Sequence, residues 1–221
     1  MGFVKQAAGL LAVVMTVATM PARSETPHLP GLPGPAVWQN ETPGWAVDDH
    51  ALTIVAGKKT DWFQWPGGGY HADSSPRLLI PTQGDFSLVT QVDVTAHTTY
   101  DAGCIALYGT ADHWAKLCLE AQAAGGFAVI SVVTRDLSDD VTSFPVAGTS
   151  TWLKVARDKD VFFFYASSDG KTWQIVRKFN LTSTDSFKVG VSAQSPDGDG
   201  ASAHFTGLRY GAGPINLWDL H

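Results

Sequence analysis

Short alternating segments, and not helical periodicity, dominate the pattern of apolar and polar positions along this chain. In residues 86–94, Phe86 and Leu88 fall on one face of an extended strand, whereas Ser87 and Asp93 fall on the other. Such alternation is typical of a strand that packs one face on a core. No segment shows a convincing amphipathic-helix pattern. The chain is therefore predicted to be all-β.

Turn residues separate candidate strands that are short and rich in Val, Phe, Tyr and Thr. These strands are Ala51–Ala56, Phe86–Thr95, Cys104–Tyr108, Trp114–Ala121, Phe127–Thr134, Trp152–Ala156, Val161–Ser167, Trp173–Phe179, Lys188–Ala193 and Ala203–Tyr210. Asp169-Gly170 is a strong hairpin signal because both residues tolerate a positive φ, and residues 157–160 form a second predicted turn. Many short strands at this spacing predict a β-sandwich or jelly roll.

The strand predicted over residues 114–120 has one face of mixed chemistry. Its apolar face is turned toward the core and consists of Ala115, Leu117 and Leu119. The opposite face carries Trp114, Lys116, Cys118 and Glu120. Sugars stack their C–H faces on tryptophan, and their hydroxyls hydrogen-bond to carboxylates and amines, so this face is suited to carbohydrate. The alternative is that Trp114 is a buried aromatic and that Lys116 and Glu120 form an ion pair.

The N-terminal residues have the features of a signal peptide. Lys5 precedes an apolar segment, Ala7–Met20, that is too short for a comfortable membrane span, and small residues precede a cleavage point after Ser24. An uncleaved anchor is the alternative. We expect a signal peptide over 1–24, a Pro/Gly-rich leader over 25–36, a jelly-roll domain over 37–213 and a tail over 214–221. This organisation predicts a secreted or periplasmic protein without a further membrane segment.

The charge of the chain excludes some classes of partner. Without Lys5 and Arg23, the mature chain has 13 basic and 21 acidic residues and a formal charge of −8. Nucleic acids and anionic membranes attract basic surfaces, so neither is an expected partner. The sequence carries no signal for an oligomeric state.

A series of short motifs extends over residues 52–210. The motifs are Lys59–Phe63, Gly84–Phe86, Tyr100–Gly103, Trp114 with Lys116 and Glu120, Val132–Thr134 followed by Ser138-Asp139, Arg157, Ser168–Trp173 and Ser195-Pro196. In this order they resemble a family of domains of unknown function whose members are often labelled "regulation of enolase" proteins. The resemblance implies a concanavalin A-like jelly roll, a β-sandwich of two antiparallel sheets that often holds carbohydrate on its concave sheet.

The chain departs from the family pattern at two places near that concave face. The segment Tyr100–Gly103 is one residue shorter than usual, and Asp140 follows Asp139 where an aromatic residue is common. Both departures bear on the identity of the ligand more than on the fold. Because fold does not fix function, carbohydrate binding remains an inference by analogy.

The predicted ligand-binding residues combine the mixed face with neighbouring segments. They are Trp114, Lys116, Glu120, Asp61, Trp62, Tyr100, Asp101 and Asp139, and Trp65 is a further candidate. The sequence favours a carbohydrate-binding, lectin-like module without clear catalytic machinery over an enzyme. A structural or protein-interaction module is a third reading.

A glycoside hydrolase is the enzymatic alternative. Such enzymes need two carboxylates that flank the scissile bond. Glu120 is one of only three glutamates, so its partner would be an aspartate such as Asp101, Asp61 or Asp139. The Glu-x-Asp-x-x-Glu strand of laminarinase-like enzymes is absent. Lys116 is expected to lower the pKa of Glu120, which is unfavourable for a general acid.

No cofactor or metal is expected. The seven histidines show no ligand spacing, and Gly67-Gly68-Gly69 does not lead into a phosphate-binding helix. Residues 197–200 (DGDG) offer oxygen ligands for calcium, but a polar turn is the better interpretation.

The two cysteines, Cys104 and Cys118, are predicted to form a disulfide. If Tyr108 and Trp114 flank a five-residue hairpin loop, equal counting along both strands places the cysteines opposite one another. An oxidising compartment would favour the bond. The alternative is a pair of buried thiols.

Overall fold

The computed structural model describes residues 27, 29, 31–42, 44–48, 50–181, 186–216 and 218. The predicted signal peptide lies outside these residues, as do four positions of the predicted leader, Glu25, Thr26, His28 and Pro30. The strands are β1 (Val37–Gln39), β2 (Gly44–Val47), β3 (Ala51–Ala56), β4 (Trp62–Gln64), β5 (His71–Asp73), β6 (Arg77–Thr82), β7 (Phe86–Thr95), β8 (Ala102–Tyr108), β9 (His113–Ala121), β10 (Phe127–Arg135), β11 (Leu137–Val146), β12 (Ser150–Asp158), β13 (Val161–Ser167), β14 (Gln174–Asn180), β15 (Phe187–Gln194) and β16 (Ala201–Ala212).

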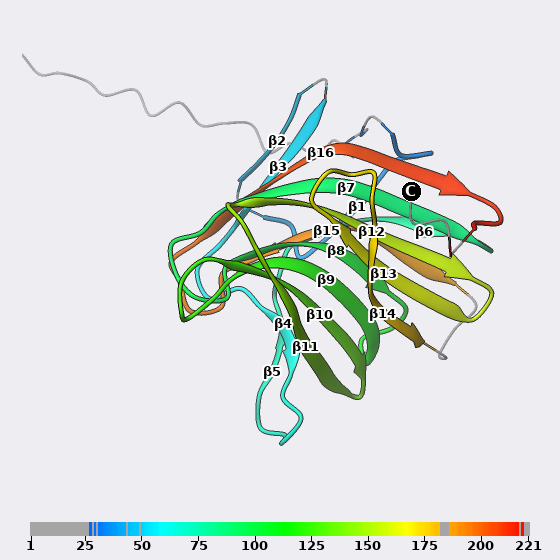
Figure 1. Ribbon diagram of the computed structural model, residues 1–221. Helices are drawn as coiled ribbons and strands as arrows, with labels where there is room; N and C mark the ends of the chain where they lie inside the picture. The colour runs from blue at the N-terminus through cyan, green and yellow to red at the C-terminus, as the bar shows by residue number, and fades with distance from the viewer. Residues whose placement is uncertain are drawn as a thin grey trace, which may run out of the picture.

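These strands form two antiparallel sheets of seven strands each, stacked face to face (Figure 1). The first sheet has the order β1-β6-β15-β8-β9-β10-β11, and the second has the order β14-β13-β12-β7-β16-β3-β2. Strands β4 and β5 form a separate hairpin that projects at the bottom of the view in Figure 1. The predicted all-β jelly-roll sandwich is confirmed. No helix in the described part of the chain is suited to span a membrane.

The main core fills the space between the two large sheets. Strand β7 contributes Phe86 and Leu88, and β9 contributes Leu117 and Leu119, all fully buried. The alternation therefore assigned the correct face of β9 to the core. Gly103 on β8 lets the sheets approach, because a Cβ there would lie 2.6 Å from the Val92 side chain.

A second apolar cluster covers the outer face of the first sheet, away from the main core. It contains Trp62, Leu79, Ala102, Cys104, Ala106, Trp114, Cys118, Ala128, Ile130 and Val132. Trp62 belongs to β4, so the hairpin β4–β5 covers this outer face. Strand β9 is consequently buried on both faces over most of its length.

The segments predicted as strands are all strands in the structure, with ends that shift by a few residues. Both predicted hairpin turns are present: Asp158 pairs with Val161 around a two-residue turn, and Gly170 adopts a φ of 70° before β14. The sequence analysis missed β1, β2, β4, β5, β6 and β11. Four of these have at most four residues, and β11, half of whose residues are polar, is mostly exposed at the edge of the first sheet.

Candidate functional site

A cavity of about 310 Å³ opens between the outer face of the first sheet and the β4–β5 hairpin. It is lined by Asp61, Phe63, Trp65, Tyr70, Tyr100, Lys116, Glu120, Ile130, Val132, Asp140, Gln194, Pro196 and Asp197, and we call it the hairpin pocket. Side chains from β9, β10, β11 and β15 form its floor. Residues that are distant in sequence therefore meet because adjacent strands of one sheet present the same face.

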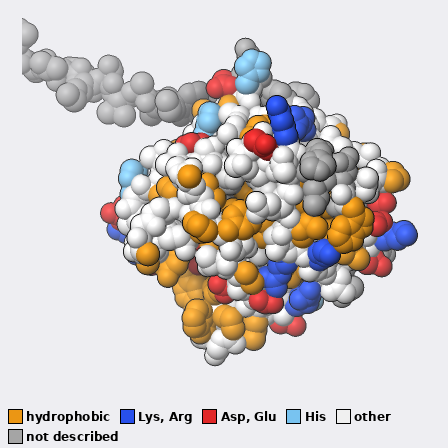
Figure 2. Space-filling model, in the orientation of Figure 1, with side chains coloured by type: hydrophobic (Ala, Val, Ile, Leu, Met, Phe, Trp, Pro, Cys, Tyr) orange, Lys and Arg blue, Asp and Glu red, His pale blue; other side chains and the backbone are white. Residues whose placement is uncertain are grey.

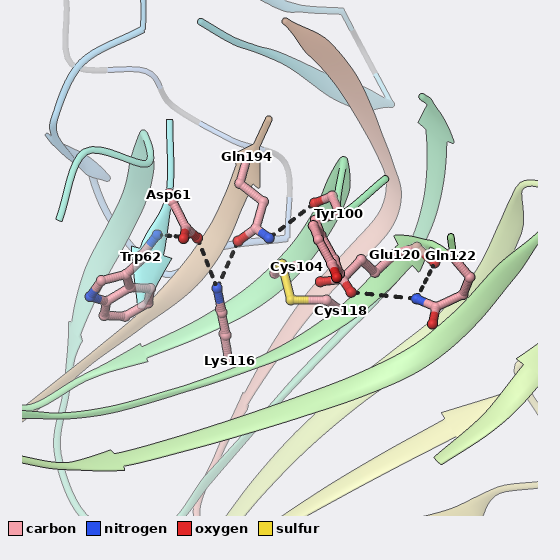
Figure 3. Close-up of a disulfide and its surroundings, with 9 residues drawn as sticks. All are labelled: Asp61, Trp62, Tyr100, Cys104, Lys116, Cys118, Glu120, Gln122 and Gln194. Carbon is pink, nitrogen blue, oxygen red and sulfur yellow. Dashed lines mark hydrogen bonds and ion pairs between the residues drawn. A yellow bond between two sulfur atoms is a disulfide. The ribbon is translucent and has the colours of Figure 1, made fainter. Parts of the chain in front are cut away.

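Lys116 lies at the base of the hairpin pocket and is almost fully buried. Its Nζ donates a hydrogen bond to Gln194 Oε1 at 2.7 Å and lies 3.7 Å from Asp61 Oδ1 (Figure 3). Burial lowers the pKa of Lys116, while the negative charges of Asp61 and Glu120 act in the opposite direction. Among the described residues, Lys116 thus forms its ion pair with Asp61 and not with Glu120.

Both oxygens of the Asp61 carboxylate are occupied. Oδ1 accepts a hydrogen bond from the backbone N–H of Trp62 at 2.7 Å and faces Lys116. Oδ2 accepts a hydrogen bond from the Tyr70 hydroxyl at 3.0 Å. Burial, together with the charge of Asp61, raises the pKa of Tyr70 to about 12, so Tyr70 keeps its proton as a donor. Asp61 therefore joins the hairpin to the sheet and compensates the charge of Lys116.

Glu120 lies on the same face of β9 as Lys116 and is 8% exposed. The side-chain amide of Gln122 donates to its backbone carbonyl at 3.2 Å and to Oε1 at 3.4 Å (Figure 3). Burial raises the pKa of Glu120 to about 7, although Lys116 and Gln122 oppose this shift. Lys116 lowers the pKa of Glu120 as expected, but the net shift is upward because loss of hydration outweighs the attraction of the lysine.

A disulfide joins β8 to β9 on the sheet face that forms the pocket floor. Cys104 and Cys118 lie directly opposite one another with Cα atoms 4.0 Å apart, in the register that residue counting predicted. Cys118 lies between Lys116 and Glu120 on β9 (Figure 3). The bond therefore fixes the strand that carries both ionisable groups of the floor.

Aromatic side chains form the walls of the hairpin pocket. Trp65, Tyr70 and Tyr100 line it and remain about half exposed. Figure 2 shows hydrophobic side chains gathered at the end of the molecule where Figure 1 places the β4–β5 hairpin. Gly67 makes room for the Trp65 indole, since a Cβ at residue 67 would lie 2.8 Å from its Nε1. The hairpin loop thus presents rings to the cavity and to solvent.

The two tryptophans that the sequence assigned to ligand stacking do not line the pocket. Trp114 is 0% exposed and Trp62 is 1% exposed, and their rings stack with centroids 4.0 Å apart. The guanidinium of Arg77 lies 4.2 Å from the centre of the Trp62 ring. The prediction of a stacking surface at Trp114 is wrong because the hairpin, which sequence analysis missed, packs over this ring. These residues anchor the hairpin instead.

Asp101 and Asp139 also have roles outside the pocket. The Asp101 carboxylate is buried and accepts hydrogen bonds from the backbone N–H groups of His97 and Thr98 at 2.7 and 2.9 Å. Asp139 is exposed and forms an ion pair with Arg177 at 2.6 Å. Its neighbour Asp140 lines the pocket, because successive residues of β11 point to opposite faces. Asp101 therefore does not act as a carboxylate partner of Glu120.

The acidic turn at residues 197–200 does not assemble a cation site in the structure. Asp199 pairs with Lys58 at 2.7 Å, and the Asp197 carbonyl accepts a hydrogen bond from Lys59 Nζ at 2.6 Å. Within the described ranges, no group of three or more His, Cys, Asp or Glu side chains is placed to hold a metal ion.

The pocket brings together four of the predicted residues: Asp61, Tyr100, Lys116 and Glu120. It also brings in the candidate Trp65. The sequence analysis did not select Phe63, Tyr70, Ile130, Val132, Asp140, Gln194, Pro196 or Asp197. Trp65 and Tyr70 flank a Pro-Gly-Gly-Gly segment, a turn signal between aromatic residues that would have indicated the hairpin.

Comparison with known proteins gives a family and a set of structural relatives. A family model described as "Protein of unknown function (DUF1349)" matches residues 38–212. "Regulation of enolase protein 1" of Saccharomyces cerevisiae is 27% identical over 171 residues, which span 76% of this chain and 85% of the relative. A crystal structure of a functionally unknown protein from Saccharomyces cerevisiae has a TM-score of 0.76 and 26% identity, with 81% of this chain and 97% of the other covered.

More distant structures share the fold alone. A GH43 protein from Bacillus licheniformis, a K247S mutant, has a TM-score of 0.64 at 18% identity, with 80% of this chain but 37% of that chain covered. Carbohydrate-binding module CBM66 from Bacillus subtilis has a TM-score of 0.52 at 14% identity, with 79% and 95% covered.

The expected secreted or periplasmic location is contradicted by these comparisons. The curated yeast relative is named "Regulation of enolase protein 1", and the yeast crystal structure is described as a functionally unknown protein. Neither description indicates export. The expectation rested on residues 1–24, which lie outside the described residues. Secretion is therefore unsupported.

Proposed function

This chain belongs to the family described as "Protein of unknown function (DUF1349)", and we propose that it binds a carbohydrate or a similar polyhydroxylated ligand in the hairpin pocket. The observation that carries the proposal is the combination of half-exposed aromatic walls with a buried polar floor. Rings of Trp65, Tyr70 and Tyr100 offer faces for the C–H surfaces of a sugar. Lys116, Gln194 and Glu120 offer donors and acceptors for hydroxyl groups.

The polar floor is organised in advance of any ligand. Gln194 accepts a hydrogen bond from Lys116 at 2.7 Å and donates one to the Tyr100 carbonyl at 3.1 Å. The disulfide and Asp61 fix the neighbouring strands. A preorganised site loses less conformational entropy when it binds, which favours affinity. The volume of about 310 Å³ is at the lower end of the range for small-molecule sites and suits one or two sugar rings.

The fold comparison is consistent with this reading but carries less weight. CBM66 of Bacillus subtilis is described as a carbohydrate-binding module, and this chain shares its fold at 14% identity. Fold alone does not determine function, so the proposal depends on the pocket of this chain.

Glycan cleavage is the second candidate function, and one observation favours it. Glu120 has a pKa of about 7, a value suited to a general acid, and Asp61 and Asp140 line the same pocket. Both oxygens of Asp61 are engaged by Lys116, Trp62 and Tyr70, which leaves Asp140 as the available second carboxylate. A binding role needs no such pair and therefore accounts for the pocket with fewer requirements.

The test is a glycan array on the full chain, with calorimetry and a reducing-end assay on every glycan retained. We expect Trp65→Ala to weaken binding about tenfold or more, because an exposed pocket tryptophan acts as an interface hot spot. Trp218→Ala is the matched control, since Trp218 is also exposed but packs against Phe163 of the second sheet. Absence of glycan binding would refute the proposal. Release of reducing ends that Glu120→Gln abolishes would establish the second function instead.

A further inference from the structure

The residues that line the hairpin pocket include more acidic than basic side chains. Lys116 is the single cation among the lining residues, and Asp61 compensates it at 3.7 Å. The remaining ionisable carboxyl groups of the lining are Glu120, Asp140 and Asp197. A ligand in the cavity therefore faces an excess of negative charge, which disfavours uronic acids and phosphorylated sugars.

Of the two buried carboxyl groups in the lining, Asp61 and Glu120, Glu120 has the weaker compensation. It is more than nine-tenths buried, and its contact with the Gln122 amide is long, at 3.4 Å. Its Oε2 accepts no hydrogen bond from the described residues. Asp61, in contrast, has donors at both oxygens. A buried carboxylate with a single weak donor is costly, so a ligand that brings a further donor to Glu120 gains more than one that contacts an already satisfied group.

Tyr100 is held next to Glu120 in an uncommon backbone conformation. Its φ is 70°, in the left-handed region that residues other than glycine seldom adopt. The N–H of Tyr100 donates to the carbonyl of Ala121 at 2.9 Å, and its own carbonyl accepts from Gln194 at 3.1 Å. Backbone strain of this kind is retained where surrounding contacts enforce it and clusters at ligand sites.

We propose that the hairpin pocket selects a sugar with a free amino group, whose ammonium lies between the Glu120 carboxylate and the Tyr100 ring. This inference rests on the proposed function and specifies its ligand class. An ammonium supplies three donors and a positive charge to the carboxylate, and it is attracted to the face of an aromatic ring. N-acetylation of the amino group removes the charge and two donors. A hydroxyl in place of the amino group supplies a single neutral donor.

The experiment compares matched sugars that differ only at the nitrogen position. Calorimetry on the full chain at about pH 7.5, above the pKa of about 7 that burial gives Glu120, uses glucose- and galactose-configured disaccharides in amino, N-acetylamino and hydroxyl forms. We expect at least one amino form to bind tenfold or more tightly than its acetylated and hydroxyl counterparts. Added salt should reduce this preference, because part of the attraction is electrostatic.

Glu120→Gln, which keeps the shape of the side chain, should remove the preference, so that the amino, acetylated and hydroxyl forms bind with similar affinities. Asp139→Asn is the control, because it removes a nearby charge that does not line the pocket, and it should keep the preference. Circular dichroism verifies that both variants are folded.

Equal affinity for the three forms, or a preference that survives in Glu120→Gln, would overturn the inference and leave carbohydrate binding intact. Failure of all forms to bind would also overturn it. Carbohydrate binding itself is refuted only if no glycan on the broad array binds.

Discussion

At the scale of single residues, Lys116 and Glu120 show how local surroundings decide the charge of two groups on one strand face. Both are nearly buried on β9, and the same loss of hydration disfavours the charged form of each. Lys116 has Asp61 and Gln194 as close partners. Glu120 has a weak amide contact and acidic neighbours in Asp61 and Asp140. The sequence places the two residues on one face but does not reveal which side chains become their partners.

The raised pKa of Glu120 predicts how stability depends on pH. The native state keeps the Glu120 proton up to about pH 7, whereas an unfolded chain releases it near pH 4.5. The native state therefore binds more protons over this window, and Glu120 lowers the free energy of unfolding as the pH rises through it. Glu120→Gln lacks this titration. We expect the variant to gain stability relative to the wild type from pH 4.5 to 7.5, by up to about 3 kcal/mol.

Urea unfolding at several pH values measures this difference. Asp139→Asn serves as the control for removal of one negative charge at an exposed position. If the unfolding free energies of wild type and Glu120→Gln remain parallel from pH 4.5 to 7.5, Glu120 is hydrated and the description of its burial is wrong.

At the scale of elements, the β4–β5 hairpin has the largest effect on the site. It buries Trp114 beneath Trp62, and its loop supplies aromatic side chains to the pocket wall. Two strands of three residues each would be marginal alone. The stacking of the two tryptophans and the hydrogen bond from Tyr70 to Asp61 hold the hairpin on the sheet.

Replacement of residues 65–70 by Asn-Gly tests whether this loop carries the binding function. Gln64 and His71 form the last pair of the hairpin ladder, so a two-residue turn closes it without a change in register. The variant keeps Trp62 over Trp114 and Tyr100 in the wall, and it loses Trp65, Tyr70 and the hydrogen bond from Tyr70 to Asp61. We expect cooperative thermal unfolding to persist while glycan affinity falls below detection in calorimetry. Retained affinity would show that the loop is not part of the site.

The strands that could be predicted from sequence are those with clear alternation between an apolar core face and a polar face, such as β7. Strand β11 escaped prediction because it is mostly exposed and lies at a sheet edge, where burial imposes little pattern. Hairpin β4–β5 escaped because its strands are shorter than the period-two pattern needs. The same omission explains the error at Trp114. Alternation identified its face correctly, but what covers that face depends on a segment some fifty residues earlier in the sequence.

At the scale of the whole molecule, the protein has two apolar layers with different roles. The large core between the sheets contains most of the buried aliphatic and phenylalanine side chains and sets the sandwich. The smaller outer cluster contains both cysteines and the stacked tryptophans, and it supports the pocket. Changes to the outer cluster should therefore alter the site and its rigidity while the sandwich remains folded.

The disulfide tests this separation of roles. Cys104 and Cys118 belong to the outer cluster and enclose a short loop, with a sequence separation of 14. A cross-link over such a loop stabilises a protein by about 3 kcal/mol, chiefly by restricting the unfolded chain. We expect reduction, or the double change Cys104→Ala and Cys118→Ala, to lower the free energy of unfolding by about this amount and to leave a folded sandwich. Urea titration with and without reductant measures the effect, and the double variant, which should not respond to reductant, is the control. Unfolding of the entire chain on reduction would show that the sandwich depends on the outer cluster, whereas two titratable thiols in the unreduced, denatured protein would show that the bond does not form.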